Sequence, residues 1–189
     1  MENRRVQMTK RLLKNALIEM LEEGVPIGKV YIRDLCNRAE INRSTFYKYY
    51  GSQYDLLEET ESDFIHQLSV HLEGAIADSS VFYSLCKYLD ENLKLARVLI
   101  NNNADAKFAE KIFRLPVLLE NYKILFGHRF DRNELEYPYI FFTHGGFFMI
   151  RAWLNKDNRE PTEEFSELIV KLLGRFLDVQ SFDFSAKKG

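Results

Sequence analysis

Two short amphipathic segments separated by three residues constrain the fold more than any other feature of this sequence. In the first, from about Ile32 to Arg38, apolar side chains recur at the spacing of a helix, and the second runs from about Arg43 to Tyr50. Glu40-Ile41-Asn42 between them has the length of turn that joins two helices steeply in a helix-turn-helix. We expect Ile41 to plug this turn and Asn42 to cap the second helix.

The outward face of the second helix carries hydrogen-bond donors and no bulky aliphatic side chain, whereas Phe46 is expected to face inward. Such a face fits the major groove of duplex DNA, where donors read base edges and contact phosphates. Any amphipathic helix has a polar face, but here the turn length, the plug and the cap agree, which favours DNA binding. We expect contacts to bases or phosphates from Arg43, Ser44, Thr45, Tyr47, Lys48 and Tyr49, and anion-binding N–H groups at the helix starts, Asn42 and Ser52.

The rest of the chain is also predicted to be helical, because it has only 4 Pro and 9 Gly and no strand-like alternation. A helix from Met8 to Glu23 should end at Gly24, and Ser52 to Asp55 reads as a capping box that opens a long fourth helix. Five more helices are expected near 80–90, 91–102, 105–126, 134–155 and 162–179, with Pro116 kinking or splitting the third of these. The prediction is an all-α protein of about nine helices.

This pattern divides the chain into two domains and a linking helix. Residues 1–52 are expected to form the helix-turn-helix domain, about 52–74 the linking helix, and 75–189 a helical bundle for ligand binding and dimerisation. We place the boundary at Gly74 to Ser80, a polar loop at 127–133 and a frayed tail from Ser181. Residues 1–50 carry a net charge of +4 and residues 51–189 one of −6, which suggests that the head meets a polyanion. In the first helix, the side chains expected to face solvent or phosphate are Lys10, Arg11 and Lys14.

Several other classes of protein are disfavoured. No apolar run approaches the roughly 20 residues of a membrane span, and no apolar segment follows the basic N-terminus, so we expect neither a membrane anchor nor a signal peptide. Cys36 and Cys86 lie in apolar helical patterns and are expected to be reduced core thiols of a cytoplasmic protein. Neither they nor the four histidines form a metal-ligand set or a nucleophile–base pair, so we expect no metal, no cofactor and no catalysis.

The last two helices are expected to contribute a dimer interface. The final helix carries a wide apolar stripe that must be buried on its own core or on a second copy of the chain. Gly145 and Gly146 in the preceding helix would let another backbone approach closely. Packing within the chain alone is the alternative, but two DNA-reading heads spaced one helical turn apart require a dimer. The candidate interface residues are Gly145, Gly146, Phe165, Leu168, Ile169, Leu172, Leu173 and Phe176.

Residues 75–189 are rich in aromatic side chains, which could line a pocket for a flat or apolar effector. A plain core is the more frequent role for such residues, and the sequence does not decide between the two. An effector would act by changing the separation of the two heads. The candidate pocket residues are Tyr88, Phe108, Phe113, Tyr122 and Phe141.

Residues 8–57 resemble the DNA-binding domain of the TetR/AcrR family of bacterial transcriptional regulators. The most specific match is Thr45-Phe46-Tyr47, followed by the aromatic Tyr50 and by Leu56-Leu57. The resemblance implies that Arg33, on the helix before the turn, lies near the DNA backbone or a base. The family usually has glycine where Glu40 stands and lysine where Gln53 stands. Both edges of the motif therefore lose favourable electrostatics here, and we expect DNA binding to depend less steeply on salt concentration.

The C-terminal part resembles the subgroup of dihydroxyacetone-kinase regulators. The matching stretches are Leu89-Asp90-Glu91-Asn92, Arg97 to Asn103, Gly145-Gly146 and Trp153-Leu154. We therefore expect a homodimeric repressor that binds a palindromic operator at the bacterial nucleoid in the cytoplasm, modulated by a small molecule. The alternative is an activator or co-regulator of the same fold that acts through a protein partner. Operator sequence, effector and sign of regulation are not fixed by the sequence.

Overall fold

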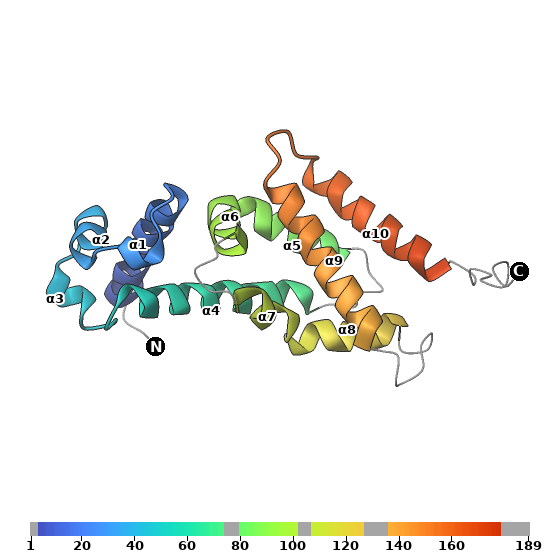
Figure 1. Ribbon diagram of the computed structural model, residues 1–189, viewed down its shortest axis with the longest axis horizontal. Coiled ribbons are helices and arrows are strands. Elements are labelled where there is room, and N and C mark those ends of the chain that lie inside the picture. The colour runs from blue at the N-terminus through green and yellow to red at the C-terminus, as the bar shows by residue number, and fades with distance from the viewer. Residues whose placement is uncertain (1–3, 74–79, 102–106, 127–135, 179–189) are drawn as a thin grey trace, which may run out of the picture.

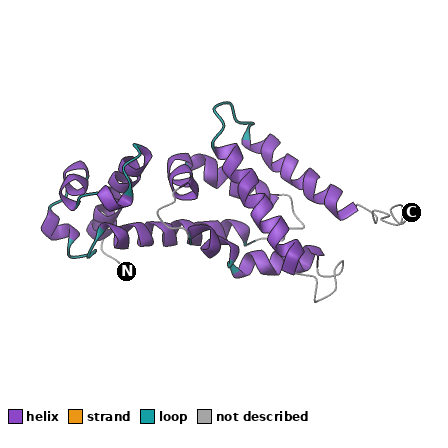
Figure 2. Cartoon of the chain, viewed as in Figure 1, coloured by secondary structure: helices purple, strands orange, loops and turns teal. Residues whose placement is uncertain are grey.

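The structure, a computed structural model, describes residues 4–73, 80–101, 107–126 and 136–178. These residues form α-helices, one 3-10 turn and no strand, which confirms the all-α class (Figures 1 and 2). The elements in chain order are α1 (Arg4–Glu22), η1 (Ile27–Lys29), α2 (Ile32–Arg38), α3 (Arg43–Phe46), α4 (Gln53–Leu72), α5 (Ser80–Glu91), α6 (Leu93–Asn101), α7 (Phe108–Phe113), α8 (Pro116–Phe126), α9 (Glu136–Leu154) and α10 (Thr162–Asp178).

Pro116 splits the helix that was expected over 105–126 into α7 and α8, which gives ten α-helices in the described part of the chain instead of about nine. The proline is the first residue of α8, where the N–H that it lacks would have no partner within the helix. Of the other expectations, the boundary at 74–79, the loop at 127–133 and the tail from Ser181 lie outside the described residues.

The helices form a small head and a larger body joined by one long helix. In Figure 1, α1, α2 and α3 gather at one end of the molecule, α4 runs from them into the body, and α3 lies at the tip farthest from α10. α10 packs against α5, and α9 packs against α6 and α8. Because α4 belongs to both parts, a shift of its body end moves the head.

The helix ends in the head follow the sequence signals. Gly24 has φ +83°, and the N–H of Val25 donates to the carbonyl of Met20 over 3.0 Å, so a Schellman motif closes α1. At the start of α4, Ser52 and Asp55 form the predicted capping box. α1 begins at Arg4, four residues before the predicted start.

One continuous apolar core fills the head and extends into the body. Cys36 and Cys86 lie within this core as free thiols, as expected. Burial raises the pKa of Cys86 to about 12, so its thiol stays protonated and inert at neutral pH. The side chains with essentially no exposed surface include Leu13, Leu17, Leu35, Phe46 and Leu56 in the head and Phe64, Leu89, Leu99, Trp153 and Leu154 toward the body.

The C-terminal motifs singled out in the sequence meet where α5, α6, α9 and α10 join. Asp90 accepts hydrogen bonds from Arg159 and from Thr162, beside the start of α10. Arg97 of α6 donates to the carbonyl of Leu154 over 2.5 Å and so holds the end of α9. Trp153 stacks on Phe165 with ring centroids 4.7 Å apart. Asp90, Arg97 and Trp153 therefore hold the body together, whereas Leu89, Ile100, Gly145 and Gly146 of the same stretches line an apolar pocket.

Candidate nucleic-acid interface

The predicted recognition helix, the second helix of the helix-turn-helix, is shorter than the sequence indicated. α3 ends at Phe46, whereas the prediction carried it to Tyr50. After Phe46 the backbone tightens, because Lys48 donates to the carbonyl of Thr45 and Tyr49 to that of Phe46, three residues back in each case. Residues 47–49 therefore continue α3 as a turn, and they stay on the same outer end of the head.

Asn42 caps α3 as predicted. Its Oδ1 accepts hydrogen bonds from the backbone N–H of Ser44 at 2.9 Å and from the Ser44 hydroxyl at 3.0 Å. The Ser44 hydroxyl is thus held in place, because it donates its proton to Asn42. Ser44 is exposed, and its hydroxyl oxygen can still accept a hydrogen bond. This is the role in which it could receive a base amino group.

The N–H groups at the start of α4 are already satisfied by the chain itself. The Asp55 carboxylate accepts hydrogen bonds from the backbone of Gly51 at 2.8 Å and from that of Ser52 at 3.1 Å. The Ser52 hydroxyl also donates to Asp55. A phosphate would have to displace this carboxylate, so the expected anion site at Ser52 is weaker than the sequence suggested.

The remaining candidates present a donor-rich outer surface. Arg43 and Lys48 are exposed, and Tyr47 exposes 58% of its surface. Arg33 is 72% exposed and is paired only through Nε, with Asp34 at 2.9 Å, which leaves the outer end of its guanidinium outside that pair. Two candidates are less exposed than the others. Thr45 is half-buried, and so is Tyr49, whose ring lies 5.9 Å from the ammonium of Lys10.

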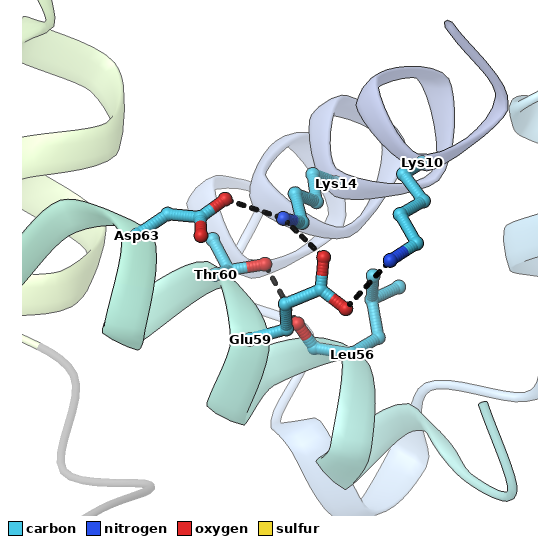
Figure 3. A network of polar contacts seen from close by, with 6 residues as sticks. All are labelled: Lys10, Lys14, Leu56, Glu59, Thr60 and Asp63. Atoms are coloured by element: carbon cyan, nitrogen blue, oxygen red, sulfur yellow. Dashed lines mark hydrogen bonds and ion pairs between the residues drawn. The ribbon is translucent and has the colours of Figure 1, made fainter. Parts of the chain in front are cut away.

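The lysines of α1 bind acidic side chains of α4, and the expectation that they face solvent or phosphate is wrong. Lys14 Nζ lies 2.8 Å from Glu59 and 2.5 Å from Asp63, and Lys10 Nζ lies 3.5 Å from Glu59 (Figure 3). Burial raises the pKa of Glu59, but the hydrogen bond from Lys14 and the lysine charges outweigh it, so that the pKa is lowered overall. The network ties the head to the linking helix.

The spacing of these charges was a signal that sequence reasoning missed. Lys10 and Lys14 are four residues apart, and so are Glu59 and Asp63, so each pair shares a helix face. A similar contact joins Arg38 to Glu23 at 2.6 and 2.9 Å, which lowers the pKa of Glu23 through the hydrogen bond and fastens α2 to the end of α1. The guanidinium of Arg38 is therefore bound to another residue of the head, Glu23.

The body contains an apolar pocket of about 410 Å³, lined by residues of every helix from α4 to α10. Three of the five predicted pocket residues line it, namely Phe113, Tyr122 and Phe141. The other two lie elsewhere. Tyr88 stacks on His71 with ring centroids 4.7 Å apart, and Phe108 is buried beside Phe64. Gly145 and Gly146 line the pocket too, which the sequence did not predict.

The apolar stripe of α10 is turned largely toward its own chain. Phe165 is buried on Trp153, so this residue, predicted at an interface, belongs to the core. Ile169, Leu172 and Leu173 are half-buried and line the pocket. Leu168 is exposed, and the side chain of Phe176 lies outside the described residues.

The most exposed apolar stripe of the body lies on α9. Its members are four, four, three and four residues apart, so they share one helix face. This α9 stripe consists of Tyr137, Phe141, Gly145, Phe148 and Ala152, all exposed. Tyr137 alone exposes 78% of its surface.

Comparison with known proteins identifies the chain. Residues 79–175, just over half of its length, match a TetR family model described as the transcriptional regulator C-terminal region. The chain belongs to the TetR family of transcriptional regulators. It is 24% identical over 182 residues to YxbF, an uncharacterized HTH-type transcriptional regulator of Bacillus subtilis (strain 168). The alignment covers 95% of this chain and 47% of YxbF, so the chain spans about half the length of that curated relative.

Solved structures share the fold of this TetR-family chain. A TetR transcriptional regulator from Streptococcus agalactiae 2603V superposes with a TM-score of 0.64 at 21% identity, over 90% of this chain and 96% of the other. The fatty acid degradation regulator FadR from Bacillus halodurans gives 0.63 at 15% identity, over 90% and 99%. Among the described residues of the present regulator, no helix has the length and apolar character needed to cross a membrane.

Glu40 shows why the TetR family usually has glycine at this point of the turn. Its φ is +55°, and the N–H of Ile41 donates to the carbonyl of Cys36 over 2.9 Å, so Glu40 takes the left-handed position that closes α2. A side chain with a Cβ is strained in this conformation by about 1–2 kcal/mol.

Glu40→Gly is expected to raise the free energy of unfolding by about 0.5–1 kcal/mol, since the relief of strain exceeds the entropy that glycine gains in the unfolded chain. Urea denaturation would measure this difference. Glu40→Gln is the matched control, because it removes the charge and keeps the Cβ. Equal stabilisation by both variants would show that the charge, and not the backbone, limits stability here.

Proposed function

We propose that this TetR-family regulator is a homodimeric repressor that binds a palindromic operator in the bacterial cytoplasm and is released from it by a small-molecule effector. The observation that carries the proposal is the group of exposed donors around α3. Arg43, Tyr47 and Lys48 are exposed in α3 or in the turn that follows it, whereas Phe46 is buried. α3 lies at the tip of the head (Figure 1). Arginine can contact guanine O6 and N7 in a bidentate manner, and tyrosine and lysine suit phosphates.

Selection of bound duplexes from a random pool, followed by footprinting, tests the DNA-binding part. We expect enrichment of an inverted repeat whose half-sites lie about one helical turn apart, because each head of a dimer reads one half-site. Binding without sequence preference, even at low salt, would contradict the proposal.

Arg43→Ala is expected to cost roughly 1–3 kcal/mol of operator binding and to relax specificity at one position of each half-site. Lys48→Ala, which removes a phosphate contact, should instead weaken binding to all sequences alike and reduce the salt slope by about one. Titration of operator and mutated operators at several salt concentrations separates the two effects. If Arg43→Ala instead weakens binding to all sequences alike, Arg43 does not contact a base.

The α9 stripe supports the homodimer. Its exposed rings form an apolar surface of the kind that marks an interaction site, and Gly145 in its middle leaves room for the backbone of a second copy. We therefore centre the proposed interface on α9, with Leu168 of α10 beside it. The rest of the exposed face of α10 is mostly charged, with Glu163, Glu164, Glu167, Lys171 and Arg175.

The pocket supports regulation by a small molecule over the alternative of a co-regulator that works only through a protein partner, since a filled body would have favoured the latter. Leu68 and Leu72 of α4 line this pocket, and the Asn121 amide of α8 donates to the carbonyl of Leu72 over 3.1 Å. A ligand that moves α8 or α4 would therefore reposition the head. FadR, named as a regulator of fatty acid degradation, shares this fold.

A further inference from the structure

We propose that the effector is an uncharged, hydrocarbon-rich organic molecule. The inference deepens the proposed function, because it names the ligand class of the same pocket. A volume of about 410 Å³ lies within the range of sites that hold drug-sized ligands. The chemistry of the wall then decides which molecules of that size can enter.

The wall of the pocket is almost entirely hydrocarbon. None of the described residues that line it is Lys, Arg, His, Asp or Glu. Its aliphatic side chains come from every helix from α4 to α10, and its aromatic rings offer large flat contact surfaces. The rings are those of Phe82, Phe113, Tyr122, Phe141, Phe142 and Phe147.

The three polar side chains of the wall carry no charge that could pair with an ion. The Asn121 amide group donates to the Leu72 carbonyl, and the Thr143 hydroxyl donates to the Tyr139 carbonyl over 2.7 Å. Burial raises the pKa of Tyr122, so its hydroxyl stays neutral. A carboxylate, phosphate or ammonium that entered would lose its water without gaining a charged partner, which strongly disfavours its binding.

An uncharged apolar molecule, by contrast, binds more tightly with every part of its apolar surface that is buried. A Cβ added to Gly145 or Gly146 would meet no atom within 4 Å, so the space beside this part of α9 is open. Glycine in a helix interior is less favourable than alanine, so α9 is destabilised where it borders this space.

Two fluorescent probes that differ only in charge test the proposal on the full chain. N-phenyl-1-naphthylamine is neutral, and 1-anilinonaphthalene-8-sulfonate has the same rings with one sulfonate. We expect the neutral probe to bind once per chain and at least tenfold more tightly than the sulfonate. 1-Decanol should displace it, and decanoate at neutral pH should not. Equal or tighter binding of the sulfonate, or failure of the neutral probe to bind, would overturn the proposal.

A charge placed in the wall makes the test independent of folding defects. Met149 is half-buried in the wall, and Met149→Lys should reverse the preference, so that the sulfonate binds at least tenfold more tightly than the neutral probe. Leu119→Lys, on the exposed face of α8, is the matched control and should leave the preference unchanged. If Met149→Lys keeps a folded circular dichroism spectrum and the original preference, the probes bind elsewhere and the inference fails.

Operator titration with and without the neutral probe separates this inference from the proposed function. If the probes discriminate by charge but operator affinity does not change, the ligand class holds and the effector role fails. If the probes do not discriminate, the ligand class fails whatever the operator affinity does.

Discussion

Phe46→Ala is expected to lower the free energy of unfolding by about 3–5 kcal/mol, whereas Tyr47→Ala, one residue along, should change it by less than about 1 kcal/mol. Phe46 is 0% exposed, and its ring lies 5.5 Å from that of Tyr50 and 5.4 Å from that of Tyr47. Truncation would leave a cavity in the apolar core of the head. Tyr47 projects outward and leaves no cavity when it is truncated.

The two variants should weaken DNA binding for different reasons. Tyr47→Ala should weaken operator binding directly, through a lost phosphate contact, even at a temperature where its head is fully folded. Phe46→Ala should weaken it only in proportion to the fraction of heads unfolded, and stabilising osmolyte should restore its binding. Phe46→Leu, which keeps most of the volume, is the control for the cavity. A loss of binding in Phe46→Ala that osmolyte does not restore would mean that the ring sets the shape of α3 as well.

The helix boundaries of the head were predictable because local chemistry sets them. Gly24, Asn42 and the Ser52–Asp55 pair each satisfy backbone groups of their own neighbours, so their spacing along the chain carries the signal. The end of α3 was not predictable in this way. No breaker stands at Tyr47, and the buried pair Phe46 and Tyr50, four residues apart, would share one face of a continued helix as well, so the pattern predicts no end there.

The site residues divide along the same line. Exposed donors on a short helix are visible in the sequence, as for Arg43 and Lys48. The partners of Lys10 and Lys14 are 45 or more residues away, and only the packing of α1 on α4 reveals them. The residues that line the pocket were hard to predict for the same reason. The sequence shows which residues are aromatic, but not where their rings pack in the fold. Tyr88 and Phe108 are aromatic like Phe113, yet their rings pack elsewhere, against His71 and Phe64.

Phe148→Glu is expected to convert the proposed dimer into a monomer and to weaken self-association at least 100-fold, equivalent to about 2.7 kcal/mol. Phe148 is 55% exposed and lies one turn from Gly145, near the middle of the α9 stripe. In the dimer the introduced carboxylate would be buried against the apolar stripe of the second copy with no cation to pair with, which costs several kcal/mol. In the monomer it faces water and costs little, so the fold should persist.

Analytical ultracentrifugation over a range of concentrations would measure this shift, and circular dichroism would verify that the monomer is folded. Lys87→Glu is the matched control, because it places a new carboxylate on the exposed side of α5. Loss of the dimer should also change DNA binding. Phe148→Glu should bind an isolated half-site as tightly as the unaltered chain does. It should lose the higher affinity of a dimer for the full inverted repeat, since the second head is no longer held nearby. If Phe148→Glu remains dimeric and Leu168→Glu does not, the copies meet through α10, and the interface must be placed there.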